Sequence, residues 1–381
     1  MNFIRLAAAA LAVILGVSLN SFGETSLVYF GTYNGALSKG IYVSRFDPVT
    51  GKLGDPELAA TMTNASFLAV APGGHFLYAV SEVDQFNGQP TGAVQAFALD
   101  TATGKLTFLN QQLSGGADPC HISVDGSGKC LLVANYGGGS VAILPIFPDG
   151  SLGAIGTKFQ HTGSSVNTNR QAGPHAHFIL PSPDNQFTLD CDLGLDRISV
   201  NRLEASAARL AHHDPPFATV AAGSGPRHLV FSRDGRFVYV INELASTITV
   251  FLYHPWGAAL TRAQTISTLP VDFNGTNTGA EIALHPDGRF LYASNRGHDS
   301  IAVFTVDRRT GRLTLVGHQS TLGRTPRHFA IDPTGRWLLA ENQGSDAVVV
   351  FAIDPVTGGL KPTGQTIALG APVCAVFAGT K

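Results

Sequence analysis

The sequence is poor in charged side chains and has no excess of basic ones. Asp, Glu, Lys and Arg make up only 14% of its 381 residues, hydrophobic residues make up 44%, and the formal net charge is -2. This apolar content is enough for a large core, and so few charges exclude an intrinsically disordered chain. Because there is no broad positive field to neutralise phosphates, we expect no nucleic-acid partner. Any function must depend on charges that the fold gathers locally.

Cysteine is also scarce. Its number and spacing fit neither a disulfide framework nor a metal site of paired cysteines. The four cysteines are Cys120, Cys130, Cys191 and Cys374. In the hairpin expected around residues 125–128, residue 123 rather than Cys120 would face Cys130. We therefore predict no bridge between these two and buried free thiols in general.

A single long apolar run stands out, at residues 6–17. It follows Arg5 and precedes the small residues Ser21 and Gly23, so residues 1–23 are typical of a secretory signal cleaved near Gly23. The run of about 12 residues is shorter than the roughly 20 that span a bilayer. We expect no stable membrane insertion after cleavage, with an uncleaved anchor as the alternative. The signal predicts a periplasmic or secreted protein, which would be cytoplasmic if this segment is not a functional signal.

Glycine, in contrast, is abundant, and much of it belongs to a repeat. An apolar strand, a turn of Pro, Asp and Gly, a second strand, a polar corner and a third strand recur with turns at positions 74, 128, 185, 235, 288 and 335. Second strands are expected at residues 237–241, 290–294 and 337–341, and third strands at 248–252, 301–306 and 348–353. Asp-x-x-Thr-Gly turns then lead to an outer strand. Four short antiparallel strands in units of about fifty residues are typical of a β-propeller blade.

The two ends of the chain complete the ring. Six full units are visible, while residues 27–31 and 41–46 supply later strands of a blade and residues 372–378 supply an isolated first strand. We predict an all-β fold, a seven-bladed β-propeller of four antiparallel strands per blade over residues 24–381, closed by N- and C-terminal strands that share one blade. Closure also removes exposed sheet edges. An eight-bladed ring, a β-helix and a WD-type repeat fit the spacing and motifs less well.

Superposing the repeats produces two polar columns, which should meet at one mouth of the central channel because the strands that carry them are antiparallel. The first column is the start of the innermost strand with the residue before it. We align His177 there with the starts of the other innermost strands, Phe67, His121, His228, Glu281, His328 and Cys374, and we align Ala176 with Cys120, Arg227 and Arg327. The second column is the polar corner after the second strand, taken together with the residue that follows the corner. From blade to blade, these pairs are Thr32-Tyr33, Ser81-Glu82, Asn135-Tyr136, Asp192-Leu193, Asn242-Glu243, Asn295-Arg296 and Asn342-Gln343.

The two columns contain residues with a structural role and residues with a functional one. A corner Asn commonly bonds nearby backbone, so we expect Asn242, Asn295 and Asn342 to hold turns. A turn does not require Glu243 in one blade and Arg296 in the next, which favours a functional role for both. Arg227 and Arg327 each follow a proline, which restricts the backbone, and an anion is the natural partner of a guanidinium group.

Several stretches resemble the lactonase family of propellers. The most specific is Ser294-Asn-Arg-Gly-His-Asp-Ser-Ile-Ala-Val-Phe, supported by Ala134-Asn-Tyr-Gly-Gly-Gly-Ser-Val and Gly225-Pro-Arg-His-Leu, and the likeness extends over about residues 27–378. This family includes the propeller type of 6-phosphogluconolactonase and the fungal carboxy-cis,cis-muconate cyclase. The resemblance implies seven blades and a channel-mouth site of His, Arg, Glu and Arg. Carried over by motif, these are His175 or His177, Arg227, Glu243 and Arg296, with His177 the better fit to the strand.

The function implied by this resemblance is hydrolysis of an anionic sugar lactone, a carboxylic ester, without a cofactor or metal. We predict His177, Arg227, Glu243 and Arg296 as catalytic. The predicted substrate-binding residues are His121, His175, His228, Asn135, Asp192, Arg327 and His328. Export suits a phosphorylated substrate poorly, so either another lactone is used or residues 1–23 are not a signal.

Other functions stay open. The same arginines could bind carboxylates in a muconate-type lactonising reaction. Alternatively, the protein could be a non-catalytic exported propeller that binds a ligand or a protein. A calcium site built from Glu281, Glu243, Asp192 and the Asn column is disfavoured by the adjacent arginines.

Overall fold

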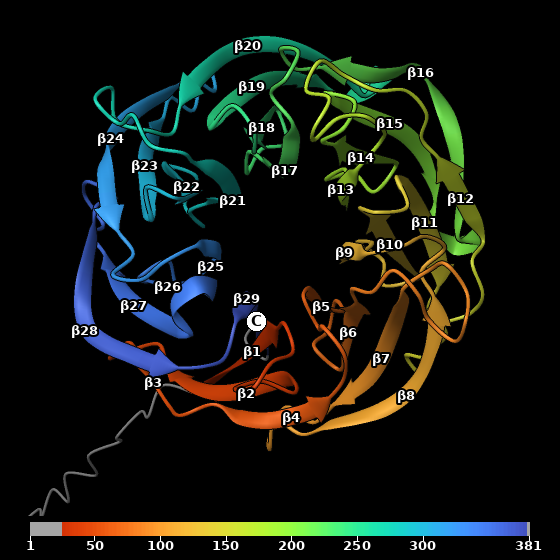
Figure 1. Ribbon diagram of the computed structural model, residues 1–381, viewed down its shortest axis with the longest axis horizontal. Helices are drawn as coiled ribbons and strands as arrows, with labels where there is room; N and C mark the ends of the chain where they lie inside the picture. Colours follow the sequence, from red (N-terminus) through yellow and green to blue (C-terminus); the bar gives the residue numbers. More distant parts are fainter. Residues whose placement is uncertain (1–24, 379–381) are drawn as a thin grey trace, which may run out of the picture.

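The computed structural model describes residues 25–378, which form a ring of seven antiparallel sheets around a central channel (Figure 1). The predicted signal segment, residues 1–23, lies outside the described residues. Blade 1 is the sheet that joins the two chain ends. Its order is β29 (Pro372–Ala378), β1 (Ser26–Thr32), β2 (Gly40–Asp47) and β3 (Lys52–Leu53), and β4 (Glu57–Thr61) also pairs with β2. No helix long and apolar enough to cross a membrane occurs within residues 25–378.

The other six blades have four strands each, which follow one another along the chain from the channel to the rim. Blade 2 is β5 (Leu68–Val70), β6 (Phe76–Ser81), β7 (Ala93–Leu99) and β8 (Leu106–Leu113). Blade 3 is β9 (Pro119–Val124), β10 (Cys130–Asn135), β11 (Ser140–Pro145) and β12 (Thr157–Gln160). Blade 4 is β13 (Ala176–Pro181), β14 (Phe187–Asp192), β15 (Arg197–Glu204) and β16 (Arg209–Thr219).

Blades 5 to 7 repeat this order. Blade 5 is β17 (Pro226–Phe231), β18 (Phe237–Asn242), β19 (Thr247–His254) and β20 (Ala259–Ser267). Blade 6 is β21 (Thr278–Leu284), β22 (Phe290–Arg296), β23 (Ser300–Val306) and β24 (Leu313–Ser320). Blade 7 is β25 (Pro326–Ile331), β26 (Trp337–Asn342), β27 (Ala347–Ile353) and β28 (Leu360–Ala368), and single 3-10 turns occur at η1 (Ala205–Ala207), η2 (Pro255–Gly257) and η3 (Gln343–Ser345).

The predicted seven-bladed fold is therefore confirmed, including the closure of the ring. β1 and β29 pair in antiparallel fashion, with Leu27 facing Ala378 and Phe30 facing Ala375. Figure 1 shows the red N-terminal strand beside the blue C-terminal strand. Because this blade combines both ends of the chain, the pairing of β1 with β29 fastens the first and last strands of the propeller to each other.

Aromatic side chains tie each blade to the next. Phe290, at the start of β22, packs on Gly358 in the outer turn of blade 7, where a Cβ atom would lie 2.4 Å from the ring. Gly358 also has a φ of +72°, which favours glycine. Two residues along the strand, the buried Tyr292 hydroxyl donates to the Gly358 carbonyl at 2.8 Å. Tyr29 and Tyr78 make the equivalent bonds in blades 1 and 2, so the recurrent turn glycines serve the packing between blades.

All four cysteines are buried free thiols, as predicted. The hairpin register was predicted wrongly, however, because Asp125 rather than residue 123 faces Cys130, and its N–H donates to the Cys130 carbonyl at 3.1 Å. The Asp125 carboxylate accepts the N–H groups of Lys129 and Cys130, at 2.6 and 2.7 Å. This tightens the turn and moves the pairing by two residues.

Candidate active site

One mouth of the channel holds a cavity of about 360 Å³ to which all seven blades contribute. This volume lies at the small end of the range for small-molecule sites, about 300–1,000 Å³. Of the residues predicted as site residues, His177, Glu243, Arg296 and Arg327 line it. The full lining is Tyr33, Glu82, Cys120, Tyr136, Arg170, His177, Glu243, Thr278, Arg296 and Arg327.

β-bulges at the start of the innermost strands supply part of this lining. In blade 4, Ala176 pairs with Asp192 and Phe178 with Cys191, which leaves His177 as the extra, unpaired residue. A bulge re-aims a side chain and is common beside active sites. The corresponding extra residues of blades 3, 5 and 7 are Cys120, Arg227 and Arg327.

The bulges correct our alignment of blade 4 by one residue. His177 occupies the position of Cys120, Arg227 and Arg327, and it is Phe178 that corresponds to His121, His228 and His328. The sequence alignment matched histidine with histidine. The spacing within each blade gives a different match. Phe178 precedes the turn residue Asn185 by as many residues as His228 precedes the turn residue Gly235, and both turn residues have a positive φ. The difference explains why His177 reaches the cavity, whereas the other three histidines lie deeper.

The residues that follow the corners supply most of the remaining lining. Five of the seven positions in that column, Tyr33, Glu82, Tyr136, Glu243 and Arg296, face the cavity. The corner residues fix the corners and also join neighbouring blades: the side-chain amide of Asn135 donates to the Ser140 hydroxyl across its own corner at 3.2 Å, and to the Ser114 carbonyl, just after β8 of blade 2, at 3.1 Å. Asp192 accepts the N–H groups of His175, Gly194 and Leu195. Neither Asn135 nor Asp192, both predicted as substrate-binding, lines the cavity.

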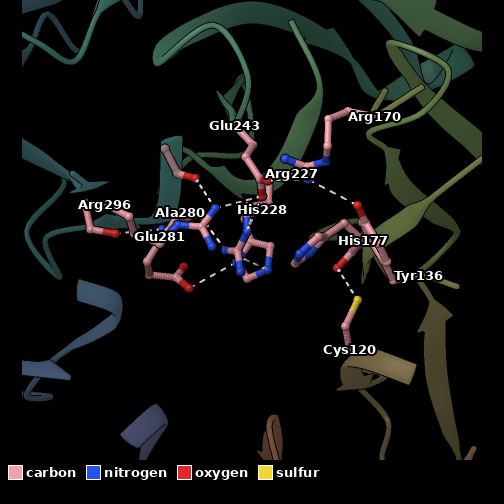
Figure 2. A network of polar contacts seen from close by, with 12 residues as sticks. Cys120, Tyr136, Arg170, His177, Arg227, His228, Glu243, Ala280, Glu281 and Arg296 are labelled. Carbon is pink, nitrogen blue, oxygen red and sulfur yellow. Dashed lines mark hydrogen bonds and ion pairs between the residues drawn. The ribbon is translucent and has the colours of Figure 1, made fainter. Parts of the chain in front are cut away.

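Glu243 is the centre of a charge network (Figure 2). Its carboxylate lies 2.7 Å from Arg170, 2.9 Å from Arg296 and 3.2 Å from Arg227. Burial alone would raise the pKa of Glu243, but the three guanidinium groups lower it to about 2. Glu243 therefore stays ionised at neutral pH. It binds Arg227 of its own blade together with Arg170 and Arg296 from other parts of the chain.

Arg227 is the buried member of this network. Its Nη1 donates to the Ala280 carbonyl at 2.7 Å, while its Nε lies 3.2 Å from Glu243 without hydrogen-bond geometry. Burial and the nearby Arg296 lower the pKa of Arg227 to about 10, so it is still charged at neutral pH. Arg227 supports the floor of the site through Glu243 and does not itself line the cavity.

Arg170 was not predicted. It lies in the loop between β12 and β13, outside the repeat, and its Nη2 donates to the Tyr136 hydroxyl at 3.2 Å and to Glu243 at 2.7 Å. The loop is fixed by Gln171, whose buried side chain donates to the Leu193 carbonyl at 2.8 Å. Since no other blade has a counterpart of this loop residue, superposed repeats contain no signal for it.

His177 is the imidazole that lines the cavity. Only 4% of it is exposed, and its Nδ1 has no hydrogen-bond partner within residues 25–378. Burial, and then the charge of Arg227, holds the pKa of His177 well below its usual range. The alternative, His175, is half-buried, stacks on Tyr136 with ring centroids 4.4 Å apart, and does not line the cavity.

Arg327 presents the least engaged guanidinium group. It lies 5.4 Å from the centroid of the Tyr33 ring and forms no hydrogen bond or ion pair with any side chain or backbone group within residues 25–378. The Tyr33 hydroxyl in turn lies 2.8 and 2.9 Å from the two carboxylate oxygens of Glu82. Arg327 is therefore available to an anion that enters the cavity.

The remaining predicted residues, His121, His228 and His328, form a buried layer below the cavity with Glu281. His228 Nδ1 lies 3.0 Å from Glu281, and His328 lies 3.5 Å from the same carboxylate. His121 packs between Phe67 and Phe178, with ring centroids 4.3 and 4.0 Å away. No group of three metal-binding side chains is found in the described part of the chain.

The opposite mouth carries no comparable chemistry. A cavity of about 590 Å³ lies there, at the other ends of the innermost strands. Glycine, proline and apolar residues such as Val70, Val124 and Phe377 line it, and none of its described lining residues has an ionisable side chain. Of the two mouths of the channel, only the first therefore combines a cavity with ionisable side chains.

Comparison with known proteins agrees with this architecture. The chain matches the family described as "Lactonase, 7-bladed beta-propeller" over residues 27–377. It is 36% identical to the 6-phosphogluconolactonase of Bacillus subtilis over 79% of this chain and 83% of that protein, and 35% identical to that of Formosa agariphila over 76% and 81%. The solved structure of the periplasmic gluconolactonase of Pseudomonas aeruginosa superposes with a TM-score of 0.87 and 36% identity, covering 93% of this chain and 99% of that one. The chain belongs to the lactonase family of seven-bladed β-propellers.

Proposed function

We propose that the protein hydrolyses a sugar lactone that carries an anionic group. The observation that carries the proposal is the meeting of a neutral, unpaired imidazole, His177, with several guanidinium groups in one small cavity. The names of the relatives, 6-phosphogluconolactonase and gluconolactonase, support the same reaction class.

His177 is the proposed general base. It takes a proton from water, whose oxygen attacks the lactone carbonyl, and the oxyanion that forms is stabilised by Arg296. When the intermediate collapses, the bond from the carbonyl carbon to the ring oxygen breaks. Protonated His177 then returns its proton to the departing ring oxygen, which leaves an open-chain hydroxy acid.

Glu243 has a positioning role in this proposal. A carboxylate with a pKa of about 2 is a weak base, and three guanidinium groups already occupy its oxygens. Its value lies in holding Arg170, Arg227 and Arg296 in place before the substrate arrives.

The anionic group of the substrate is assigned to Arg327. Among the residues that line the cavity, the three guanidinium groups of Arg170, Arg296 and Arg327 exceed the two carboxylates of Glu82 and Glu243 by one positive charge. This excess suits a phosphate monoester or a carboxylate. Export through residues 1–23 to the periplasm or beyond would favour a lactone available outside the cytoplasm, and the periplasmic relative supports that location.

A lactone panel tests the proposal. Aldonic acid lactones with and without a phosphate group are assayed by proton release with the wild type, His177→Gln, Arg296→Ala and the control His175→Gln. Removing the base should lower kcat by roughly 10²- to 10⁴-fold, whereas His175→Gln, a change of the histidine outside the cavity, should keep most of the activity. Wild-type rates equal to the buffer blank on every lactone would end the proposal.

A further inference from the structure

Two glutamates face the same cavity in opposite surroundings. Glu243 contacts three guanidinium groups, while Glu82 forms no ion pair with any residue in the range 25–378. Both occupy the position after the corner, Glu243 in blade 5 and Glu82 in blade 2. A carboxylate that makes no direct ion pair in a cavity containing several arginines is free to bind a ligand, whereas Glu243 is occupied by the arginines themselves.

Glu82 is held in place by Tyr33 alone among the side chains described. The Tyr33 hydroxyl lies within 2.9 Å of both carboxylate oxygens but has only one hydrogen to donate. Burial raises the pKa of Tyr33, so its hydroxyl stays a donor. A carboxylate has about four acceptor sites, and most of those on Glu82 therefore remain unused.

We propose that Glu82, positioned by Tyr33, forms a hydroxyl-binding subsite for the polyhydroxylated part of the substrate. The inference deepens the proposed function and rests on it for the nature of the substrate. The unused acceptor sites of Glu82 require hydrogen-bond donors, and vicinal sugar hydroxyls are donors that a carboxylate can bind in pairs. Arg327, beside Tyr33, places the anion-binding group next to this subsite.

The same geometry selects against substrates that carry only carboxylates. Glu82 forms no direct ion pair among the described residues, so a second negative charge placed against it would be repelled. A sugar lactone with one anionic group satisfies both Arg327 and Glu82. An unsaturated polycarboxylate can bind the arginines but offers no hydroxyl donor to Glu82. The subsite therefore favours the sugar lactone.

Binding of two matched ligands tests the subsite without requiring turnover. 6-Phospho-D-gluconate and 6-(phosphonooxy)hexanoate share both the phosphate and the carboxylate and differ in the hydroxyls, and their Kd values are measured by calorimetry. Glu82→Gln should weaken binding of the sugar acid by roughly tenfold or more and leave binding of the hexanoate unchanged. Tyr33→Phe, which removes only a hydroxyl, should cause a smaller change of the same kind.

Asp84→Asn is the matched control, because Asp84 is an exposed acid two residues away that does not line the cavity. It should alter neither Kd. Equal losses for both ligands, no loss for either, or failure of the wild type to bind the sugar acid more tightly would overturn the subsite. If the sugar-selective loss appears while no lactone is hydrolysed, only the proposed reaction fails.

Discussion

Nη2 of Arg170 lies 2.7 Å from Oε1 of Glu243, although the two residues are 73 positions apart in the chain. Arg170 also donates to the Tyr136 hydroxyl. A loop of blade 4 that has no counterpart in the repeat is thus fastened to residues at the corners of blades 3 and 5. This contact makes the loop part of the site.

Replacing Arg170 by Ala should therefore lower kcat/KM by roughly tenfold, because Glu243 loses one charged hydrogen bond and the network becomes less fixed. The free energy of unfolding should change by less than about 1 kcal/mol, since the Arg170 side chain is 39% exposed. Lactone kinetics and urea unfolding check both numbers, with Arg209→Ala, an exposed arginine paired with Glu204, as the control. An unchanged kcat/KM would remove Arg170 from the site.

The repeat made the fold and part of the site predictable. Turn spacing identified six blades, and the strands at residues 27–31 and 372–378 identified the closing blade, which β1 and β29 form. Because corners and strand starts recur, superposition also brought Glu243 and Arg296 to one mouth. Superposition did not identify Tyr33, Glu82 and Tyr136 as site residues, although they occupy the same column and line the same cavity.

What was missed depends on features that do not repeat. Arg170 belongs to an insertion, and Glu341 occupies a position in β26 where Ala134, Cys191 or Ile241 stands in other blades. The depth of His177, in contrast, was predictable from the spacing, because Phe178 and His228 each lie seven residues before the turn residue of their blade. Our alignment matched residue types instead of distances, and the extra residue of the bulge then shifted blade 4 by one position.

The depressed pKa of His177 predicts the pH dependence of activity. Burial and Arg227 favour the unprotonated imidazole, so the base stays competent as the pH falls through 6.5, the ordinary value. We expect kcat/KM to be level from neutral pH down to about 6.5 and to decline only at lower pH. Arg227→Gln should move this acid limb towards higher pH. A wild-type inflection at or above 6.5 would contradict the assignment of His177 as the base.

Arg327→Ala should discriminate between anionic and uncharged lactones. Because the guanidinium group of Arg327 has no other hydrogen-bonding task among the described residues, its loss should raise KM for a phosphorylated lactone by roughly ten- to hundredfold. KM for the uncharged lactone should change little. Arg324→Ala, which removes an exposed charge three residues away, is the control. Equal effects on the two lactones would show that Arg327 acts on the fold of the mouth instead.

Below the cavity, the Glu341 carboxyl is completely buried beside His328. Nδ1 of His328 accepts the Ala375 N–H at 3.3 Å and also lies 2.9 Å from Oε2 of Glu341. We expect an unprotonated Nδ1 at this position and a neutral Glu341 carboxyl that donates the short hydrogen bond to it. Complete burial agrees, because it raises the pKa of Glu341 well above the ordinary value.

This proton predicts that Glu341→Gln becomes stabilising relative to the wild type as the pH rises. Below about pH 4.5 the carboxyl is protonated in both the folded and unfolded states, and the two proteins should differ little. Above it, the unfolded wild type ionises while the folded one does not, so wild-type stability falls by up to about 1.4 kcal/mol per pH unit until the folded pKa is reached. Urea unfolding from pH 4 to 8 measures this difference, with the exposed Glu57→Gln as control. A constant or opposite slope would mean that Glu341 is ionised in the folded protein.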